Sequence, residues 1–114
     1  MSSEADRLLH ARSILVADLS APPTLDALAE RIGMSHARLN REFKREFGST
    51  VCEYLRLYRL EQAKFLLASS ETSITEISHA LGFASASHFA SQFKAHFDLS
   101  PTAYRAAEHT RSKQ

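Results

Sequence analysis

Glycine and proline are scarce in this sequence, with 3 of each among 114 residues. β-Branched residues are also sparse, so the composition argues against a sheet and favours an all-α fold. No apolar run approaches the roughly 20 residues of a membrane-spanning helix, and the N-terminus lacks the hydrophobic region of a signal peptide. We therefore expect no membrane partner.

Cysteine is almost absent as well. Cys52 is the single cysteine and cannot form an internal disulfide, which fits a protein of the reducing cytoplasm. It offers no metal-ligand spacing, and the 6 histidines are scattered along the chain. His88 and His96 lie 8 positions apart, too far along a helix to share one ion. We expect no metal site and no cofactor.

Catalytic motifs are missing too. The sequence contains no glycine-rich phosphate loop, no paired-carboxylate site and no activated nucleophile. The protein is therefore not expected to be an enzyme.

Hydrophobic residues make up 44% of the chain, which excludes a disordered protein, and 114 residues suit one domain. The net charge of +1 is weak for a protein that binds nucleic acid, but the charges are uneven. Residues 35–64 carry seven basic side chains against four acidic ones, whereas residues 65–100 carry only Lys94 against three acidic ones. The net balances of these two segments are +3 and −2, so a case for nucleic-acid binding must rest on where the charges lie.

An internal repeat is the most informative feature that is present. The residues that match at an offset of 49 positions are Leu25, Leu28, Ile32 and Gly33 against Ile74, Ile77, Leu81 and Gly82. The residues that match at an offset of 50 are Ser35, Leu39, Phe43, Lys44, Phe47 and Tyr54 against Ser85, Phe89, Phe93, Lys94, Phe97 and Tyr104. Each copy predicts a short helix, a glycine turn, a serine cap and a second helix. Two copies at a fixed separation indicate a periodic ligand, and duplex DNA is the obvious one.

Caps and turn residues divide the chain into seven predicted helices. The first begins after Ser3 and runs to about Leu19, because the prolines at 22 and 23 disfavour helix just before them. The expected N-terminal caps of the later helices are Thr24, Ser35, Thr50, Ser73, Ser85 and Ser100. The helix after Thr50 is the longest, at about 17 residues or roughly 25 Å. Its inward face is expected to hold Leu55, Ala63, Leu66 and Leu67.

These helices predict an all-α domain over residues 1–109, with two helix-turn-helix subdomains joined by a long connecting helix. The first unit spans about residues 24–48, the connecting helix about 51–67 and the second unit about 73–98. The chain is polar after about Ala107 and is expected to fray, with residues 110–114 as a tail.

The second helix of the first unit has the faces that a DNA-reading helix needs. On a wheel of about 100° per residue, Leu39, Phe43 and Phe47 form one apolar stripe. The residues on the opposite side are Ala37, Arg38, Arg41, Lys44 and Arg45. Such a helix can enter a major groove, although the same pattern also fits an ordinary solvated amphipathic helix.

Positions along this helix suggest different roles. Arg41 is the best candidate base reader, with Arg38 and Asn40 flanking it, because an arginine fork matches the paired acceptors of guanine. Lys44 and Arg45 lie further along and are expected to meet phosphates, as is the cap Ser35.

The second copy has a different outward face. The equivalent positions are Ser87, His88, Ser91, Lys94 and Ala95. This face can bond to phosphates, also through the cap Ser85, and accommodate a thymine methyl, but it offers no bidentate arginine. We expect the first unit to supply most base discrimination and the second mainly register and affinity.

Together these residues resemble the DNA-binding domain of the AraC/XylS family of bacterial transcription regulators, from Thr24 to Arg105. The matching segments are TLDALAERIGMS, LNREFKREFG, YLRLYRLEQAKFLL, SITEISHALGF, SHFASQFKAHF and SPTAYR. The resemblance implies two recognition helices in successive major grooves, about one helical turn (roughly 34 Å) apart. It places base contacts at Ala37, Asn40 and Arg41 and at Ala86, Ser87 and Ser91.

Three positions depart from the family pattern. Ser91 stands where relatives often have arginine, Asp98 replaces a common glycine after the second recognition helix, and Ser78 replaces an alanine at a close helix contact. Asp tolerates the left-handed conformation, and Ser is small enough for the contact, so the fold is expected to hold.

The resemblance also implies partners and leaves alternatives open. RNA polymerase is expected beside DNA, and an N-terminal effector or dimerisation domain, absent here, precedes this part in many relatives. We expect a fragment of a longer regulator, with a short stand-alone regulator as the alternative. The other functional class is a helical protein-interaction module with weak or non-specific DNA binding. The sign of regulation, the inducer and the target promoter stay open.

Overall fold

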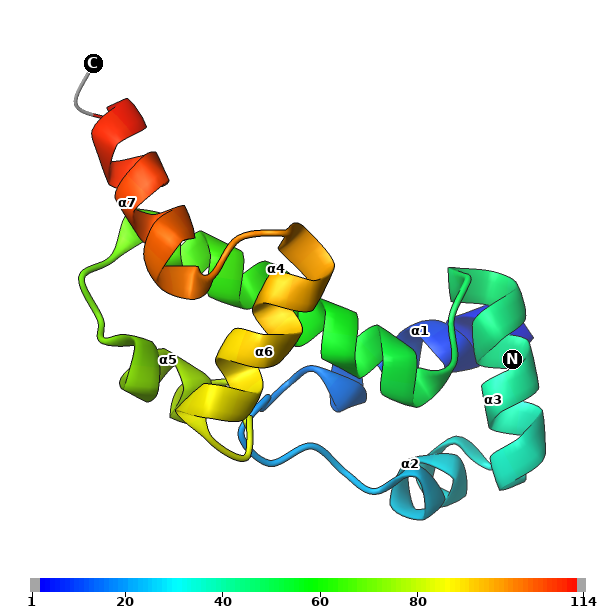
Figure 1. The fold of residues 1–114 in the computed structure, drawn as a ribbon. Coiled ribbons are helices and arrows are strands. Elements are labelled where there is room, and N and C mark those ends of the chain that lie inside the picture. Colours follow the sequence, from blue (N-terminus) through cyan, green and yellow to red (C-terminus); the bar gives the residue numbers. More distant parts are fainter. Residues whose placement is uncertain (1–2, 113–114) are drawn as a thin grey trace. The chain divides into compact units, whose positions relative to one another are not determined.

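The computed structural model describes residues 3–112, which form helices and no strand (Figure 1). The seven helices of this part are α1 (Glu4–Leu15), α2 (Leu25–Ile32), α3 (His36–Phe47), α4 (Val51–Ser69), α5 (Ile74–Ala80), α6 (Ala86–Phe97) and α7 (Pro101–Ser112). The all-α prediction is confirmed. The chain divides into two compact units between Tyr58 and Arg59, within α4; we call them unit 1 and unit 2.

All six predicted caps form. In each, the side-chain oxygen accepts a hydrogen bond from the backbone N–H three residues later, at 3.0–3.3 Å. Ser3 adds a complete capping box with Asp6. Each cap contributes about 1 kcal/mol by satisfying an N–H that the helix cannot. The helix starts could therefore be predicted from single capping residues.

Unit 1 packs α1, α2 and α3 around one core. Its buried members are Leu8, Ala11, Leu15, Leu28, Ala29, Ile32, Met34, Leu39, Phe43 and Val51. The predicted stripe of α3 is confirmed, since Leu39 and Phe43 are fully buried and Phe47 packs against the core half-buried. This stripe fixes which side of α3 faces outward.

Unit 2 has the same construction from α4, α5 and α6. Its buried apolar side chains are Leu60, Ala63, Leu67, Ile77, Leu81, Phe83, Phe89, Phe93 and Pro101. Ser78 is fully buried among them, and its hydroxyl donates to the carbonyl of Thr75 at 2.7 Å. A buried hydroxyl without a partner would be costly, so this bond explains why serine is tolerated there.

The repeat extends beyond the part that the sequence revealed. At an offset of 52, the buried residues of α1 match those of α4: Leu8, Ala11 and Leu15 against Leu60, Ala63 and Leu67. Arg12 lies 4.9 Å from the Phe47 ring centroid, and Lys64 lies 4.9 Å from that of Phe97. Each unit thus opens with the same kind of helix, and the second such helix is the C-terminal part of α4.

Helix ends were predicted less well than helix starts. α1 was expected to reach about Leu19 but ends at Leu15. The Asp18 carboxylate accepts hydrogen bonds from the Ser20 N–H at 3.1 Å and the Ser20 hydroxyl at 2.6 Å. Such a side-chain turn competes with helix, and its hydrogen bonds lower the pKa of Asp18.

The expectation of fraying after about Ala107 was wrong, because α7 continues to Ser112. Nη1 of Arg111 lies 3.8 Å from Oε1 of Glu108, one turn earlier, and such a pair stabilises a helix. Residues 113 and 114 of the predicted tail lie outside the described residues. Within residues 3–112, no helix combines the length and apolar character needed to span a membrane.

Candidate DNA-binding surface

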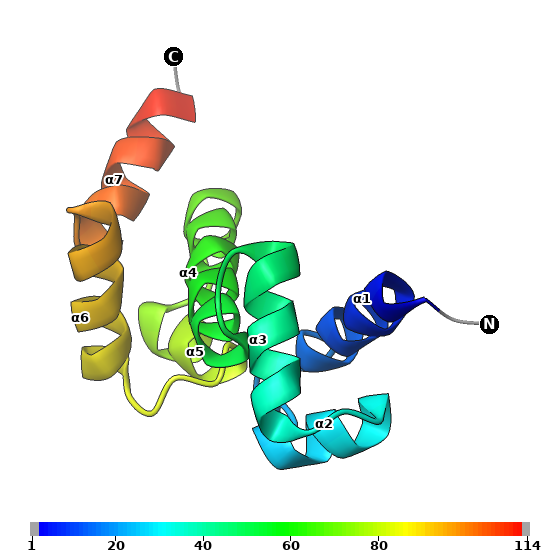
Figure 2. The ribbon, with the colours of Figure 1, turned by 90° about the vertical axis from the view of Figure 1, so that its right-hand side faces the viewer.

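The turn between α2 and α3 sets the direction of α3 in unit 1 (Figure 2). Gly33 adopts φ 77°, which favours glycine. The Arg7 guanidinium closes the turn, since its Nη2 donates to the carbonyls of Ile32 at 2.7 Å and Gly33 at 2.9 Å. A Cβ on Gly33 would come within 2.9 Å of that nitrogen. The helix-turn-helix geometry therefore depends on both glycine and arginine.

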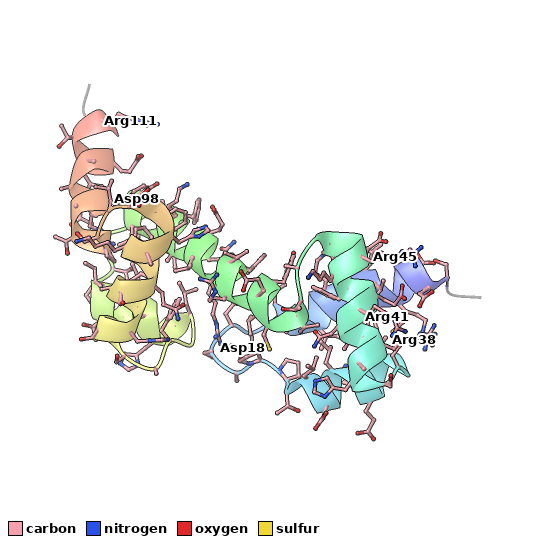
Figure 3. The ribbon with its side chains drawn as sticks, turned by 45° about the vertical axis from the view of Figure 1, so that its right-hand side comes forward. Asp18, Arg38, Arg41, Arg45, Asp98 and Arg111 are labelled. Atoms are coloured by element: carbon pink, nitrogen blue, oxygen red, sulfur yellow. The ribbon has the colours of Figure 1, made fainter. Side chains whose placement is uncertain are left out.

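The outward side of α3 is cationic. The side chains of Arg41 and Arg45 are 68% and 81% exposed, and Lys44 and Ala37 are exposed with them. Figure 3 shows Arg41 and Arg45 along one side of the helix. Because the apolar stripe occupies the other side, this surface is available to a polyanion.

An acidic residue lies inside this cationic surface. Glu42 is only 16% exposed, with carboxylate oxygens 3.7 Å from Arg41 Nε and 3.9 Å from Arg45 Nη1. These contacts are long and both arginines are largely exposed to solvent, so each is worth less than about 1 kcal/mol. The sequence counted Glu42 only in the charge balance, whereas the structure places it between two candidate DNA contacts.

Two predicted base readers have partners inside unit 1. Asn40 is half-buried, and its Oδ1 accepts a hydrogen bond from the Val51 N–H, the first of α4, at 3.1 Å. The Nη2 of Arg38 donates to Oε1 of Glu4 in α1 at 2.8 Å. Neither contact was visible in the sequence, because each joins residues distant along the chain.

The outward side of α6 in unit 2 is mostly uncharged. Ser87, His88, Ser91 and Lys94 are exposed, and Ala86 is half-buried. Nε2 of His88 lies 3.2 Å from Nε2 of Gln92. This helix presents hydroxyls, an imidazole and a single lysine, so it offers none of the arginine forks found on α3.

The end of α6 has an unusual backbone. Asp98 adopts φ 65°, the only positive φ of a non-glycine residue in the described part of the chain. Its counterpart in unit 1, Gly48, has φ 85°. The predicted left-handed Asp98 is confirmed.

The serine caps and the tyrosines complete the two surfaces. Ser35 and Ser85 are exposed at the N-termini of α3 and α6, where backbone dipoles favour an anion. Tyr54 and Tyr104 instead pack edge-on against Phe43 and Phe93, with ring centroids 5.3 and 5.7 Å apart. Among residues 3–112 there is no group of three or more side chains placed to hold a metal ion.

Comparisons with known proteins agree with this geometry. A family described as a helix-turn-helix domain matches residues 28–107. An AraC-type DNA-binding domain from Chromobacterium violaceum has 34% identity, covers 91% of this chain and 93% of its own, and superimposes with a TM-score of 0.84. The chain belongs to the AraC-type helix-turn-helix family.

Other relatives of this AraC-type domain extend the comparison. The DNA-binding domain of AdpA, solved with a target DNA, has 30% identity and a TM-score of 0.87, covering 95% of this chain and 97% of its own. The regulatory protein PchR of Pseudomonas aeruginosa is 42% identical over 63% of this chain and 24% of its own length. The transcriptional activator RhaS of Escherichia coli is 40% identical over 67% of this chain and 27% of its own length. The matched segment is thus about a quarter of these curated relatives.

Proposed function

We propose that this chain is a sequence-specific double-stranded DNA-binding regulator of transcription at bacterial promoters. In this proposal α3 and α6 enter successive major grooves. The similarity to AdpA supports it, because that domain was solved with its target DNA bound. The transcription regulators among the relatives, PchR and RhaS, support it from sequence.

The observation that carries the proposal is the exposed cationic side of α3. Arg41 has a 68% exposed side chain and holds only a 3.7 Å contact with Glu42, so its guanidinium can turn towards guanine. We assign Arg41 to base reading, with the small Ala37 beside it for apolar contact. Lys44, Arg45 and Ser35 are assigned to phosphates, which fix the register without reading sequence.

Asn40 and Arg38 receive different roles from those expected. A bidentate contact of asparagine with adenine uses its amide oxygen and nitrogen together, and the oxygen of Asn40 already accepts from Val51. We propose that Asn40 supports α4 and does not read bases. Arg38 can reach DNA only in competition with Glu4.

Unit 2 is assigned the weaker share of base reading. Ala86, Ser87, His88 and Ser91 can exclude or accept a thymine methyl and form single hydrogen bonds, which discriminate less than a bidentate pair. Ser85 and Lys94 are assigned to phosphates. Unit 2 then contributes mainly affinity and register.

Selection of bound sites from a pool of random duplexes tests the function, followed by titration of a selected duplex across a salt series. A DNA-binding domain loses affinity steeply as salt rises, because phosphate contacts release counterions. A selected sequence should contain a guanine whose replacement weakens binding of the wild-type protein. Failure to enrich any sequence, with no duplex binding at low salt, would contradict the proposal and favour a protein-interaction module.

The wider role is also a proposal. We infer that the domain acts in the cytoplasm, contacts RNA polymerase as well as DNA, and is joined to an effector or dimerisation domain in the full regulator. Activation is the sign we propose, because the relative RhaS is a transcriptional activator. A promoter-reporter assay with and without the domain would give the sign.

A further inference from the structure

The first turn of α1 contacts the recognition helix of unit 1. The Nη2 of Arg38 lies 2.8 Å from Oε1 of Glu4, and both side chains are 43% exposed. Arg38 is in the first turn of α3 (Figure 3), the part that meets base edges in helix-turn-helix proteins. A carboxylate of the protein therefore holds a cation at the position where DNA would approach.

We propose that Glu4 competes with DNA for Arg38 and lowers the affinity that the α3 surface would otherwise have. This inference rests on the proposed function. A guanidinium forms a bidentate contact with guanine or phosphate through two nitrogens, either Nη1 and Nη2 or Nε and Nη2. Nη2 therefore takes part in both arrangements. Arg38 must leave Glu4 to form either bidentate contact, and a phosphate arriving beside it would be repelled by the carboxylate.

The contact is weak enough to be displaced. Exposed ion pairs change an equilibrium constant by at most about fivefold. Glu4 is also the first residue of α1, where the helix dipole stabilises a carboxylate even when Arg38 has left. Glu4 therefore reduces the affinity and does not block binding.

The position of α1 does not depend on this contact. Arg7, one turn later, donates to the carbonyls of Ile32 and Gly33, and Leu8 and Ala11 are buried in the core. The variant Glu4→Gln is thus expected to keep α1 in place. Its effect on DNA binding can then be attributed to the lost charge.

A double-mutant cycle on DNA affinity tests the proposal. The proteins are the wild type, Glu4→Gln, Arg38→Ala and the double variant, and the probe is a labelled mixed-sequence duplex of about 30 base pairs, titrated by fluorescence anisotropy at low salt. We expect Glu4→Gln to bind about two- to fivefold more tightly than the wild type. The same change on the Arg38→Ala background should have little effect.

A matched control separates this contact from a general charge effect. Glu46→Gln removes the same charge from an exposed position of α3 and should change affinity equally with and without Arg38. Glu4→Asp keeps the charge at the helix N-terminus but shortens the side chain, so it should give a smaller gain than Glu4→Gln. Glu4→Asp also tests the contact if circular dichroism shows that Glu4→Gln is unfolded.

The outcomes are distinct. Glu4→Gln binding no more tightly than the wild type, or an equal gain without Arg38, would overturn the competition while leaving DNA binding intact. A wild-type protein that binds no duplex would overturn the proposed function and this inference together.

Discussion

The side-chain oxygen of Asn40 in α3 accepts a hydrogen bond from the backbone N–H of Val51, the first residue of α4. Val51 is buried in the core of unit 1. The bond therefore satisfies a helix-terminal N–H that has no partner within α4, and it ties the recognition helix to the next helix.

Asn40→Ala is expected to destabilise the protein by about 1–2 kcal/mol, because it leaves the Val51 N–H without a partner. Asn40→Asp keeps a hydrogen-bond acceptor and should therefore lose less stability. Urea unfolding followed by circular dichroism measures both. If Asn40→Ala changed the preferred DNA sequence and left stability unaltered, Asn40 would be a base reader and our assignment would be wrong.

Asp98→Asn is expected to stabilise the protein by about 0.3–1 kcal/mol. Asparagine tolerates a positive φ and removes a negative charge from the C-terminal end of α6. Asp98→Ala should instead destabilise by about 1 kcal/mol, since alanine resists the left-handed conformation. Thermal unfolding gives the comparison, and a stabilising alanine would contradict the strain we assign to this position.

We expect Tyr104 to make the folded protein less stable in alkali. Burial, and then the negative charge of Glu108, raise the pKa of its hydroxyl above 10.0. The folded state thus holds the Tyr104 proton more tightly than the unfolded state does. The resulting contribution to the free energy of unfolding is complete below pH 10 and is lost as pH rises through the folded-state pKa. Tyr104→Phe should have a shallower decline of stability above that pH in urea titrations. Identical declines for both proteins would refute the prediction.

Lys44→Ala is expected to weaken binding to all duplexes by a similar factor. A lysine that meets phosphate carries no sequence information, so its loss should reduce the slope of log affinity against log salt by about 1. Salt titrations with a selected and an unselected duplex measure the slope. A loss confined to the selected duplex would instead place Lys44 at a base.

The sequence was sufficient for features that depend on neighbours along the chain. Caps form within three residues, so Thr24 and Ser85 could be recognised directly. The apolar stripe of α3 follows from its period. The left-handed Asp98 was expected from the family resemblance, because relatives commonly have glycine at this position after the second recognition helix.

Features that depend on contacts between distant residues could not be predicted. The pairs Arg38 with Glu4 and Asn40 with Val51 join residues 34 and 11 positions apart, and no local pattern marks either. The match between α1 and the end of α4 was missed because its offset of 52 differs from that of the rest. It became recognisable through shared burial, as with Leu8 and Leu60.

In the proposed function, the cationic side of α3 reads bases and α6 reads few. Site selection with Arg41→Ala and Ser91→Ala, beside the wild type, tests it most directly. Loss of a bidentate arginine should cost about 1–3 kcal/mol of discrimination at one base pair. We predict that Arg41→Ala relaxes the preference at one position of the site while Ser91→Ala leaves the selected sequence nearly unchanged. Equal relaxation by both variants, or none by Arg41→Ala, would show that α3 does not supply most of the base discrimination.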